Sequence, residues 1–193
     1  MGKILAVNGS PRKDGNTEHM LRAVLDVCVG AGHQTQIYQA GGRVVRGCLA
    51  CGNCGKNTGR CLTDDWINEL YPQMAEADVI LLGSPTYFGD LTPEIKAVID
   101  RTGFISRRDG MRFSRKIGAG ISPVRRAGSL HVLDSINHFF LINDMIIPGS
   151  SYWNMSLARE PGECEKDTEG MATMKRLGEN IVWLLEKLSG GGC

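Results

Sequence analysis

Residues 3–17, KILAVNGSPRKDGNT, join a short apolar run to a loop of small and basic residues. The apolar run at 3–8 stops at a Gly-Ser-Pro turn, which is typical of a buried strand. A helix is predicted from about Asn16, because apolar residues then recur at helical spacing on one face: Met20, Leu21, Val24, Leu25 and Cys28. Cys28 is therefore expected to be a small core residue. The stretch predicts a strand–loop–helix unit, the building block of an α/β fold.

Four more strands are predicted, at 34–39, 78–83, 116–121 and 145–147. Helical patterns lie between them, opened in one case by Asp64-Asp65 and in another by Thr92-Pro93. Thr92 is expected to cap its helix, and proline is well tolerated at the first helical position. A last helix carries a Met and Leu stripe from Met171 to Leu188. Strands alternating with helices predict a doubly wound parallel sheet, and we expect one domain over residues 1–193.

The composition excludes several classes of protein. A chain of 193 residues with 42% hydrophobic content can bury a substantial core, and a net charge of +1 argues against nucleic-acid binding. No apolar run approaches the length of a membrane span, and the N-terminus has no signal-peptide pattern, so we expect a cytoplasmic protein. Seven cysteines in such a chain suggest metal or redox use rather than disulfides. Cys193, in a Gly-rich tail, is given no role.

Four of the cysteines stand close together in the segment GCLACGNCGKNTGRC, residues 47–61. Their spacing is C-x2-C-x2-C-x6-C: Cys48, Cys51, Cys54 and Cys61. Three thiolates at every third residue on a Gly-rich loop can wrap one side of an iron–sulfur cluster, and the fourth closes the other side. Zinc is less favoured, because it usually takes two separated CxxC knuckles. A redox-labile loop that holds nothing is the remaining alternative.

The loop after the first strand has the composition of a phosphate site. Ser10 and Thr17 supply hydroxyl groups, Arg12 supplies a guanidinium, and the amides at the helix start point toward an anion. The loop is neither a Walker A motif nor GxGxxG, and no acidic residue occurs between Asp26 and Asp64, after the second strand. These features favour a mononucleotide over a dinucleotide. A plain turn is the alternative interpretation.

The loop after the third strand, SPTYFGD at 84–90, carries two adjacent aromatic residues. Backbone amides near Gly89 can bind a flat polar heterocycle while Tyr87 or Phe88 flanks its face. Ordinary packing of loop aromatics is the alternative. The presence of the phosphate loop favours the first interpretation.

These motifs together resemble a known family. The pairs GSPR…GNT at 9–17 and GSPTYFG…IKAVIDRTG at 83–103 resemble the NADPH-dependent FMN reductase group of flavodoxin-like proteins. The four-cysteine run between them resembles the iron–sulfur flavoprotein branch of that group. The resemblance implies a flavodoxin-like sheet of order 2-1-3-4-5 with the cysteine-rich loop, at about 43–63, after the second strand. It also implies FMN and a [4Fe–4S] cluster as cofactors.

The resemblance also assigns residues. It implies that Ser10, Arg12, Asn16 and Thr17 bind the flavin phosphate, and that a second loop contacts the isoalloxazine: Pro85, Thr86, Tyr87, Phe88 and Gly89. The loop after the fourth strand occupies the place of another flavin-contacting segment, with Ser122, Val124 and Arg125 as candidates. An arginine near the pyrimidine side stabilises reduced, anionic flavin; a solvated loop is the alternative for Arg125.

Basic residues accompany the cysteines and suggest partners. Arg43, Arg46, Lys56 and Arg60 are expected to offset the charge of four thiolates and to attract an acidic carrier such as a ferredoxin. A second basic run at 107–116 is expected either to bind the same carrier or a nicotinamide phosphate, or to be a solvated loop. The resemblance implies a homodimer or homotetramer in which the cluster of one subunit approaches the flavin of another.

The predicted function is electron transfer by an iron–sulfur flavoprotein, with the cluster handling single electrons and FMN accepting one or two. We identify no acid–base or nucleophilic set of residues, so no catalytic side chain is predicted. One alternative is a NAD(P)H-dependent FMN or quinone reductase without a cluster. Another is an interaction protein that senses redox state through its thiols.

Overall fold

The computed structural model describes residues 1–56 and 59–190. Cys193 and two residues of the predicted cysteine-rich loop, 57 and 58, lie outside this range. In chain order the elements are β1 (Lys3–Asn8), α1 (Asn16–Gly30), β2 (Gln34–Gln39), η1 (Asn53–Gly55), α2 (Ile67–Glu76), β3 (Val79–Gly83), α3 (Pro93–Arg108), β4 (Ile117–Val124), α4 (Ser129–Ile142), β5 (Met155–Leu157), η2 (Glu163–Lys166) and α5 (Thr168–Gly190). No helix in the described part is both long and apolar enough to span a bilayer.

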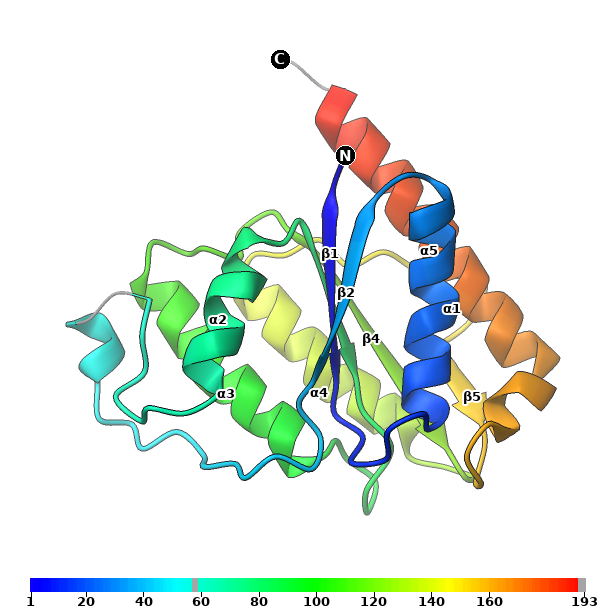
Figure 1. The fold of residues 1–193 in the computed structure, drawn as a ribbon, viewed down its shortest axis with the longest axis horizontal. Helices are drawn as coiled ribbons and strands as arrows, with labels where there is room; N and C mark the ends of the chain where they lie inside the picture. Colours follow the sequence, from blue (N-terminus) through cyan, green and yellow to red (C-terminus); the bar gives the residue numbers. More distant parts are fainter. Residues whose placement is uncertain (57–58, 191–193) are drawn as a thin grey trace.

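The five strands form one parallel sheet in the order β2-β1-β3-β4-β5, as predicted. β1 is the second strand of the sheet, where the chain first adds β2 on one side and then β3 on the other. Strand order therefore reverses beside β1, and ligands of such sheets bind at the carboxyl ends of strands near this point. In Figure 1 these ends lie along the lower edge of the molecule.

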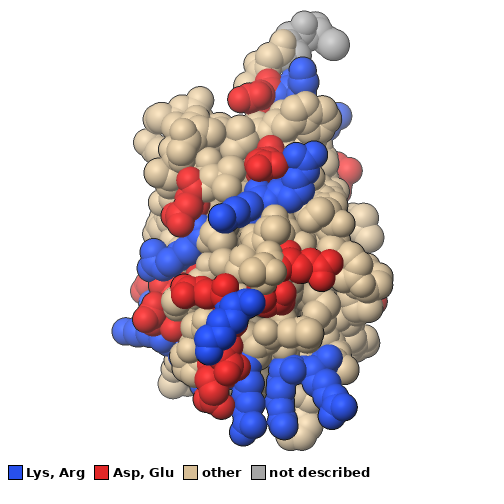
Figure 2. Space-filling model, turned by 90° about the vertical axis from the view of Figure 1, so that its right-hand side faces the viewer, with Lys and Arg blue, Asp and Glu red and all other residues tan. Residues whose placement is uncertain are grey.

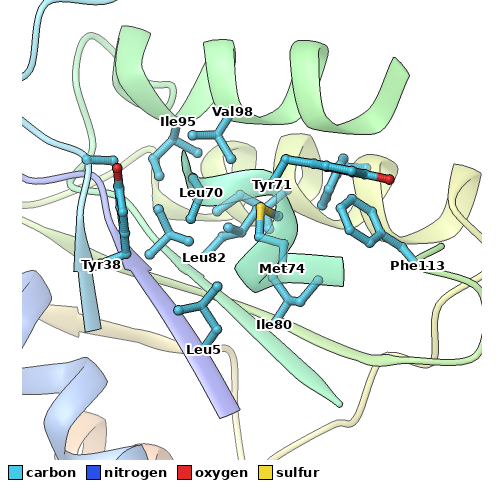
Figure 3. Close-up of a cluster of buried hydrophobic side chains, with 14 of the residues drawn as sticks. Leu5, Tyr38, Leu70, Tyr71, Met74, Ile80, Leu82, Ile95, Val98 and Phe113 are labelled. Atoms are coloured by element: carbon cyan, nitrogen blue, oxygen red, sulfur yellow. The ribbon is translucent and has the colours of Figure 1, made fainter. Parts of the chain in front are cut away.

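Helices cover both faces of the sheet (Figure 1). α1 and α5 pack on one face, in a cluster that contains Leu21, Leu81 and Leu177. α2, α3 and α4 pack on the other face, where Figure 3 shows aromatic and aliphatic side chains filling the space beneath the helices, Tyr71 and Leu82 among them. Burial on both faces explains why β3 and β4 read as continuous apolar runs. Cys28 is fully buried in the first cluster, as predicted.

The position of the fifth strand differs from the prediction at 145–147. That segment makes only one bridge, in which Ile146 pairs with Ile117 at the start of β4. β4 continues to Val124, beyond its predicted end, and the far half of its edge pairs with β5 at 155–157. Two separated segments thus share one edge, because Pro148-Gly149 diverts the chain after the bridge.

One of the two predicted helix starts differs from expectation. Thr92 precedes α3 as predicted, yet its hydroxyl makes no capping bond within the described residues and donates instead to the Gly9 carbonyl oxygen, at 3.1 Å. α2 begins after Asp65, whose Oδ1 accepts from the Ile67 amide at 3.1 Å. The Thr92 bond links the start of α3 to the loop after β1, and so helps to position that loop.

Candidate functional site

A cavity of about 200 Å³ opens at the carboxyl ends of β1, β3 and β4. Seven of the predicted flavin-binding residues line it: Ser10, Arg12, Asn16, Pro85, Thr86, Tyr87 and Arg125. Gly15, Pro123, Ala158, Arg159 and Pro161 complete the wall, and none of these described lining residues is acidic. Figure 2 shows Lys and Arg side chains gathered along the same lower edge of the molecule. The cavity therefore suits an anionic ligand with a flat or apolar part.

The loop between β1 and α1 has the features of an anion site. α1 begins after Gly15, and no side chain in the described range caps it, so its first amides remain available. Thr17 is buried beside the cavity, and its Oγ1 has no hydrogen-bond partner in the described residues. A buried hydroxyl without a partner is costly unless a ligand or water satisfies it. These groups fit a phosphate.

Asn16 lines the cavity, but its side chain also holds another loop in place. Its Nδ2 donates to the Glu160 carbonyl at 2.9 Å, and its Oδ1 accepts from the Cys164 amide at 3.2 Å. Burial raises the pKa of the Cys164 thiol to about 11, which keeps it protonated and inert. These bonds fix residues 158–161 against the phosphate loop, and so place Arg159 on the cavity wall.

The loop after β3 forms a tight hairpin. Tyr87 and Asp90 exchange backbone hydrogen bonds, with the Tyr87 amide 2.7 Å from the Asp90 carbonyl oxygen and the reverse bond at 3.0 Å. Phe88 and Gly89 occupy the corners with φ of 50° and 85°. Two positive φ values are typical of a type I′ turn, but an aromatic residue rarely adopts one. The Phe88 side chain is fully exposed and does not line the cavity, unlike that of Tyr87.

The predicted residues at the end of β4 lie behind the cavity wall. Ser122 is buried, with its Oγ 3.1 Å from Thr86 Oγ1, and Val124 is buried as well. Gly128, at φ 101°, brings the β4 loop against the β3 loop, because a Cβ built there would lie 3.0 Å from Gly89 Cα. Ser122, Val124 and Gly89 therefore support the residues that line the cavity, and Arg125 is the β4-loop candidate with access to it.

The four predicted metal ligands line a second cavity, of about 110 Å³: Cys48, Cys51, Cys54 and Cys61. All four are free thiols. Among the described residues, no three Cys, His, Asp or Glu side chains converge closely enough to hold a single metal ion. Zinc requires such convergence, with all sulfurs about 2.3 Å from one point, whereas a cubane cluster takes one thiolate on each of four irons. Four thiols around one cavity are the donor set that a cubane cluster takes.

The segment that carries these cysteines is anchored at several points. The Trp66 indole donates to the Val44 carbonyl at 2.8 Å, before the first cysteine. Asn68 Oδ1 accepts from the Cys61 amide at 2.8 Å. Within the segment, the Ala50 amide lies 3.4 Å from Cys48 Sγ, an N–H···S contact of the kind that stabilises a thiolate.

The basic residues near the cysteines differ in part from the prediction. Arg60 is partly neutralised by an acidic neighbour, since its Nη2 pairs with Asp64 at 2.7 Å. Arg43 lies over the Tyr38 ring, 4.9 Å from its centroid. The arginines that line the cysteine cavity are Arg101 and Arg108, both from α3.

Arg101 is buried, and its guanidinium pairs with both carboxylate oxygens of Asp65, each at 2.7 Å. Burial acts to lower the pKa of Arg101, but its hydrogen bonds to Asp65, together with the charge interaction with the nearby Cys61, raise that pKa overall. The residue therefore stays charged beside the thiols.

Two residues that line these cavities were not predicted from the sequence: Arg101 and Arg159. For Arg101 a signal was present, because it follows Ile95 and Val98 on the apolar face of α3, where a charged residue requires a buried partner. Arg108 belongs to the second predicted basic run, whose members do not form one patch. Arg108 lines the cysteine cavity, whereas Arg107 donates to the Ile142 carbonyl at 2.7 Å. No local pattern distinguishes Arg159, which reaches the cavity only through the contacts of Asn16.

The sequence matches the family described as NADPH-dependent FMN reductase over residues 2–160. It is 31% identical over 187 residues to an iron–sulfur flavoprotein of Methanocaldococcus jannaschii, covering 93% of this chain and 95% of the relative. This chain belongs to the iron–sulfur flavoprotein branch of the FMN reductase family. A second iron–sulfur flavoprotein, from Methanosarcina thermophila, is 32% identical over 186 residues and covers 95% of both chains.

Solved structures confirm the fold expected of this branch. RosB with bound 8-demethyl-8-formylriboflavin-5'-phosphate has a TM-score of 0.74 at 14% identity, covering 98% of this chain and 81% of the other. A flavodoxin from the domain Archaea has a TM-score of 0.63 at 16% identity, covering 96% of this chain and 99% of the other. The predicted flavodoxin-like fold and the predicted family are both confirmed.

Proposed function

We propose that this flavoprotein transfers electrons between a one-electron carrier and FMN through a [4Fe–4S] cluster held by four cysteines: Cys48, Cys51, Cys54 and Cys61. The observation that carries the proposal is that one chain holds a cavity suited to a phosphorylated flat ligand and a second cavity lined by four free thiols. The names of the relatives support both cofactors.

FMN would bind at the carboxyl edge of the sheet. Its phosphate would take the free amides of α1, the Thr17 hydroxyl and the guanidinium groups of Arg12 and Arg159. Its ring would lie toward Tyr87 and Arg125. The bound flavin would supply two-electron chemistry and the cluster one-electron chemistry. The residues that line the two cavities would bind and orient these cofactors and set the charge around them.

The assembly would be a homodimer or homotetramer. The two cavities share no described lining residue, and Figure 1 shows the η1 loop at one side of the molecule, away from the β5 and α1 side. A cluster set apart from the flavin of its own chain is useful for electron transfer only if another chain brings a flavin close. We therefore propose that the cluster of one subunit faces the flavin of another.

The electron donor would be an acidic, ferredoxin-like protein, with NAD(P)H as the alternative donor that the family description favours. Arg108, which is exposed at the cysteine cavity, supports an acidic protein partner. The free thiols support a reducing compartment, the cytoplasm.

Iron, acid-labile sulfide and flavin analysis of anaerobically purified protein tests the proposal. We expect about four irons per chain, bound FMN, and loss of iron but not of FMN when Cys54 is changed to Ser. The matched control is Cys28→Ser, in a buried cysteine away from the cavity, which should leave the iron content unchanged. FMN without iron, with rapid NADPH oxidation, would favour a cluster-free reductase. Absence of both cofactors would favour a thiol-based redox sensor.

A further inference from the structure

Arg101 ties together the two ends of the cysteine segment. Its Nη1 donates to the Arg46 carbonyl at 3.2 Å, before Cys48, and its Nη2 donates to the Thr63 carbonyl at 3.1 Å, after Cys61. Each of these nitrogens also bonds one oxygen of Asp65 at 2.7 Å. The side chain is 1% exposed, so the charge depends on these partners rather than on water.

One donor of this guanidinium is left over. An arginine has five N–H groups, of which Nη1 and Nη2 use four here. The fifth, on Nε, is buried and has no partner among the described residues. Leaving a buried donor unpaired is unfavourable, and such a group requires an explanation. Arg101 lines the cysteine cavity, where thiolate and sulfide sulfur are the acceptors that a cluster would bring.

On the basis of the proposed function, we infer that Arg101 is a positioning residue for the cluster. Its Nη1 and Nη2 anchor the loop, and its Nε–H donates to cluster sulfur in the cavity that Arg101 and the cysteines line. Such a hydrogen bond withdraws electron density from sulfur and favours the more negative, reduced cluster. Because the anchor and the donor belong to the same side chain, Arg101 sets both the position of the cysteine loop and the reduction potential of the cluster.

Arg101→Lys separates the hydrogen bonds of Arg101 from its charge. Lysine keeps the positive charge but lacks both the paired Nη donors that anchor the loop and the Nε–H. The measurement is the midpoint potential of the cluster by anaerobic titration, with iron content determined on the same samples. We expect the equilibrium constant for reduction to fall about tenfold, equivalent to about 59 mV for one electron. The matched control is Arg108→Lys, on the same helix and cavity but exposed, which should change the constant less than threefold.

A second variant, Asp65→Asn, weakens the anchor while keeping the guanidinium and its Nε–H. This variant should retain iron. Its equilibrium constant for reduction should not fall, because the substitution removes a negative charge near the cluster. Loss of iron or a tenfold fall in this variant would show that the anchor alone sets the cluster's properties, and would overturn the inferred Nε–H donor even if Arg101→Lys held no iron. An unchanged constant in Arg101→Lys would overturn it as well.

The wild-type protein keeps the two proposals apart. Wild-type protein without iron would refute the proposed function. Wild-type protein with about four irons, combined with an unchanged constant in Arg101→Lys, would refute only the role of Arg101.

Discussion

Changing Arg159 to alanine should weaken FMN binding through the phosphate and leave binding of the ring unchanged. Arg159 lines the cavity beside the phosphate loop, held there by the bond from Asn16 to the Glu160 carbonyl. The same cavity already holds Arg12 close to the start of α1. Arg159 is therefore a second cation for a dianionic group.

The size of the effect follows from the exposure of the side chain. A hydrogen bond to a charged group contributes about 1.5–3 kcal/mol when well buried. The Arg159 side chain is 65% exposed, and its Nε already lies 3.2 Å from Glu160 Oε1. Solvent screening and this competing carboxylate reduce the contribution to about 1 kcal/mol, or a roughly fivefold rise in the Kd for FMN. Glu160→Gln should lower that Kd modestly, because it removes the competitor.

Titration of the apoprotein with FMN, followed by quenching of flavin fluorescence, measures the change. Riboflavin is the matched ligand, since it lacks the phosphate, and Arg176→Ala is the matched variant. Arg176 is similarly exposed and pairs with Glu179 at 2.8 Å, but it does not line the cavity. Equal FMN affinity in the two arginine variants, or equal losses of FMN and riboflavin affinity in Arg159→Ala, would show that Arg159 does not bind the phosphate.

Three further changes test the loops around the cavity. Phe88→Asn should stabilise the apoprotein by about 1 kcal/mol in urea unfolding, because asparagine tolerates the positive φ better and the exposed ring has little packing to lose; a less stable variant would contradict this. Gly128→Ala should destabilise by about 1–2 kcal/mol, since its φ is 101° and the new Cβ meets backbone of the adjoining loop at 3.0 Å; unchanged stability would be inconsistent with that close contact. Asp167→Ala should cost about 1 kcal/mol at pH 7. Burial acts to raise the pKa of Asp167, but hydrogen bonds from the Gly170 and Leu157 amides lower it overall. The stability that Asp167 contributes is therefore complete above its pKa in the unfolded chain, about 3.9, and is lost as the pH falls through its lower pKa in the folded protein. The difference from wild type should therefore shrink below about pH 4, and a constant difference would contradict the assignment.

Much of the architecture could be predicted because it rests on local patterns. The strands at 3–8 and 34–39 have the predicted bounds, since apolar residues and turn signals delimit them. The cysteine spacing and the two loops were also visible as short motifs. Seven predicted residues line one cavity because the carboxyl ends of parallel strands meet at one edge.

Local sequence patterns were sufficient to predict the alternation of strands and helices, the edge at which the loops gather and the four thiols of the cysteine segment. The position of the fifth strand is set by tertiary contacts, because it depends on how far β4 extends and on which distant segment reaches its edge. Tertiary contacts also set the roles of Asn16 and Arg101, whose bonding partners lie 36 or more residues away in the chain. They set the role of Arg159 as well, since its position depends on the bond from Asn16 to Glu160. Periodicity reports which face of an element is buried, whereas the partner of a buried polar group is set by packing between elements.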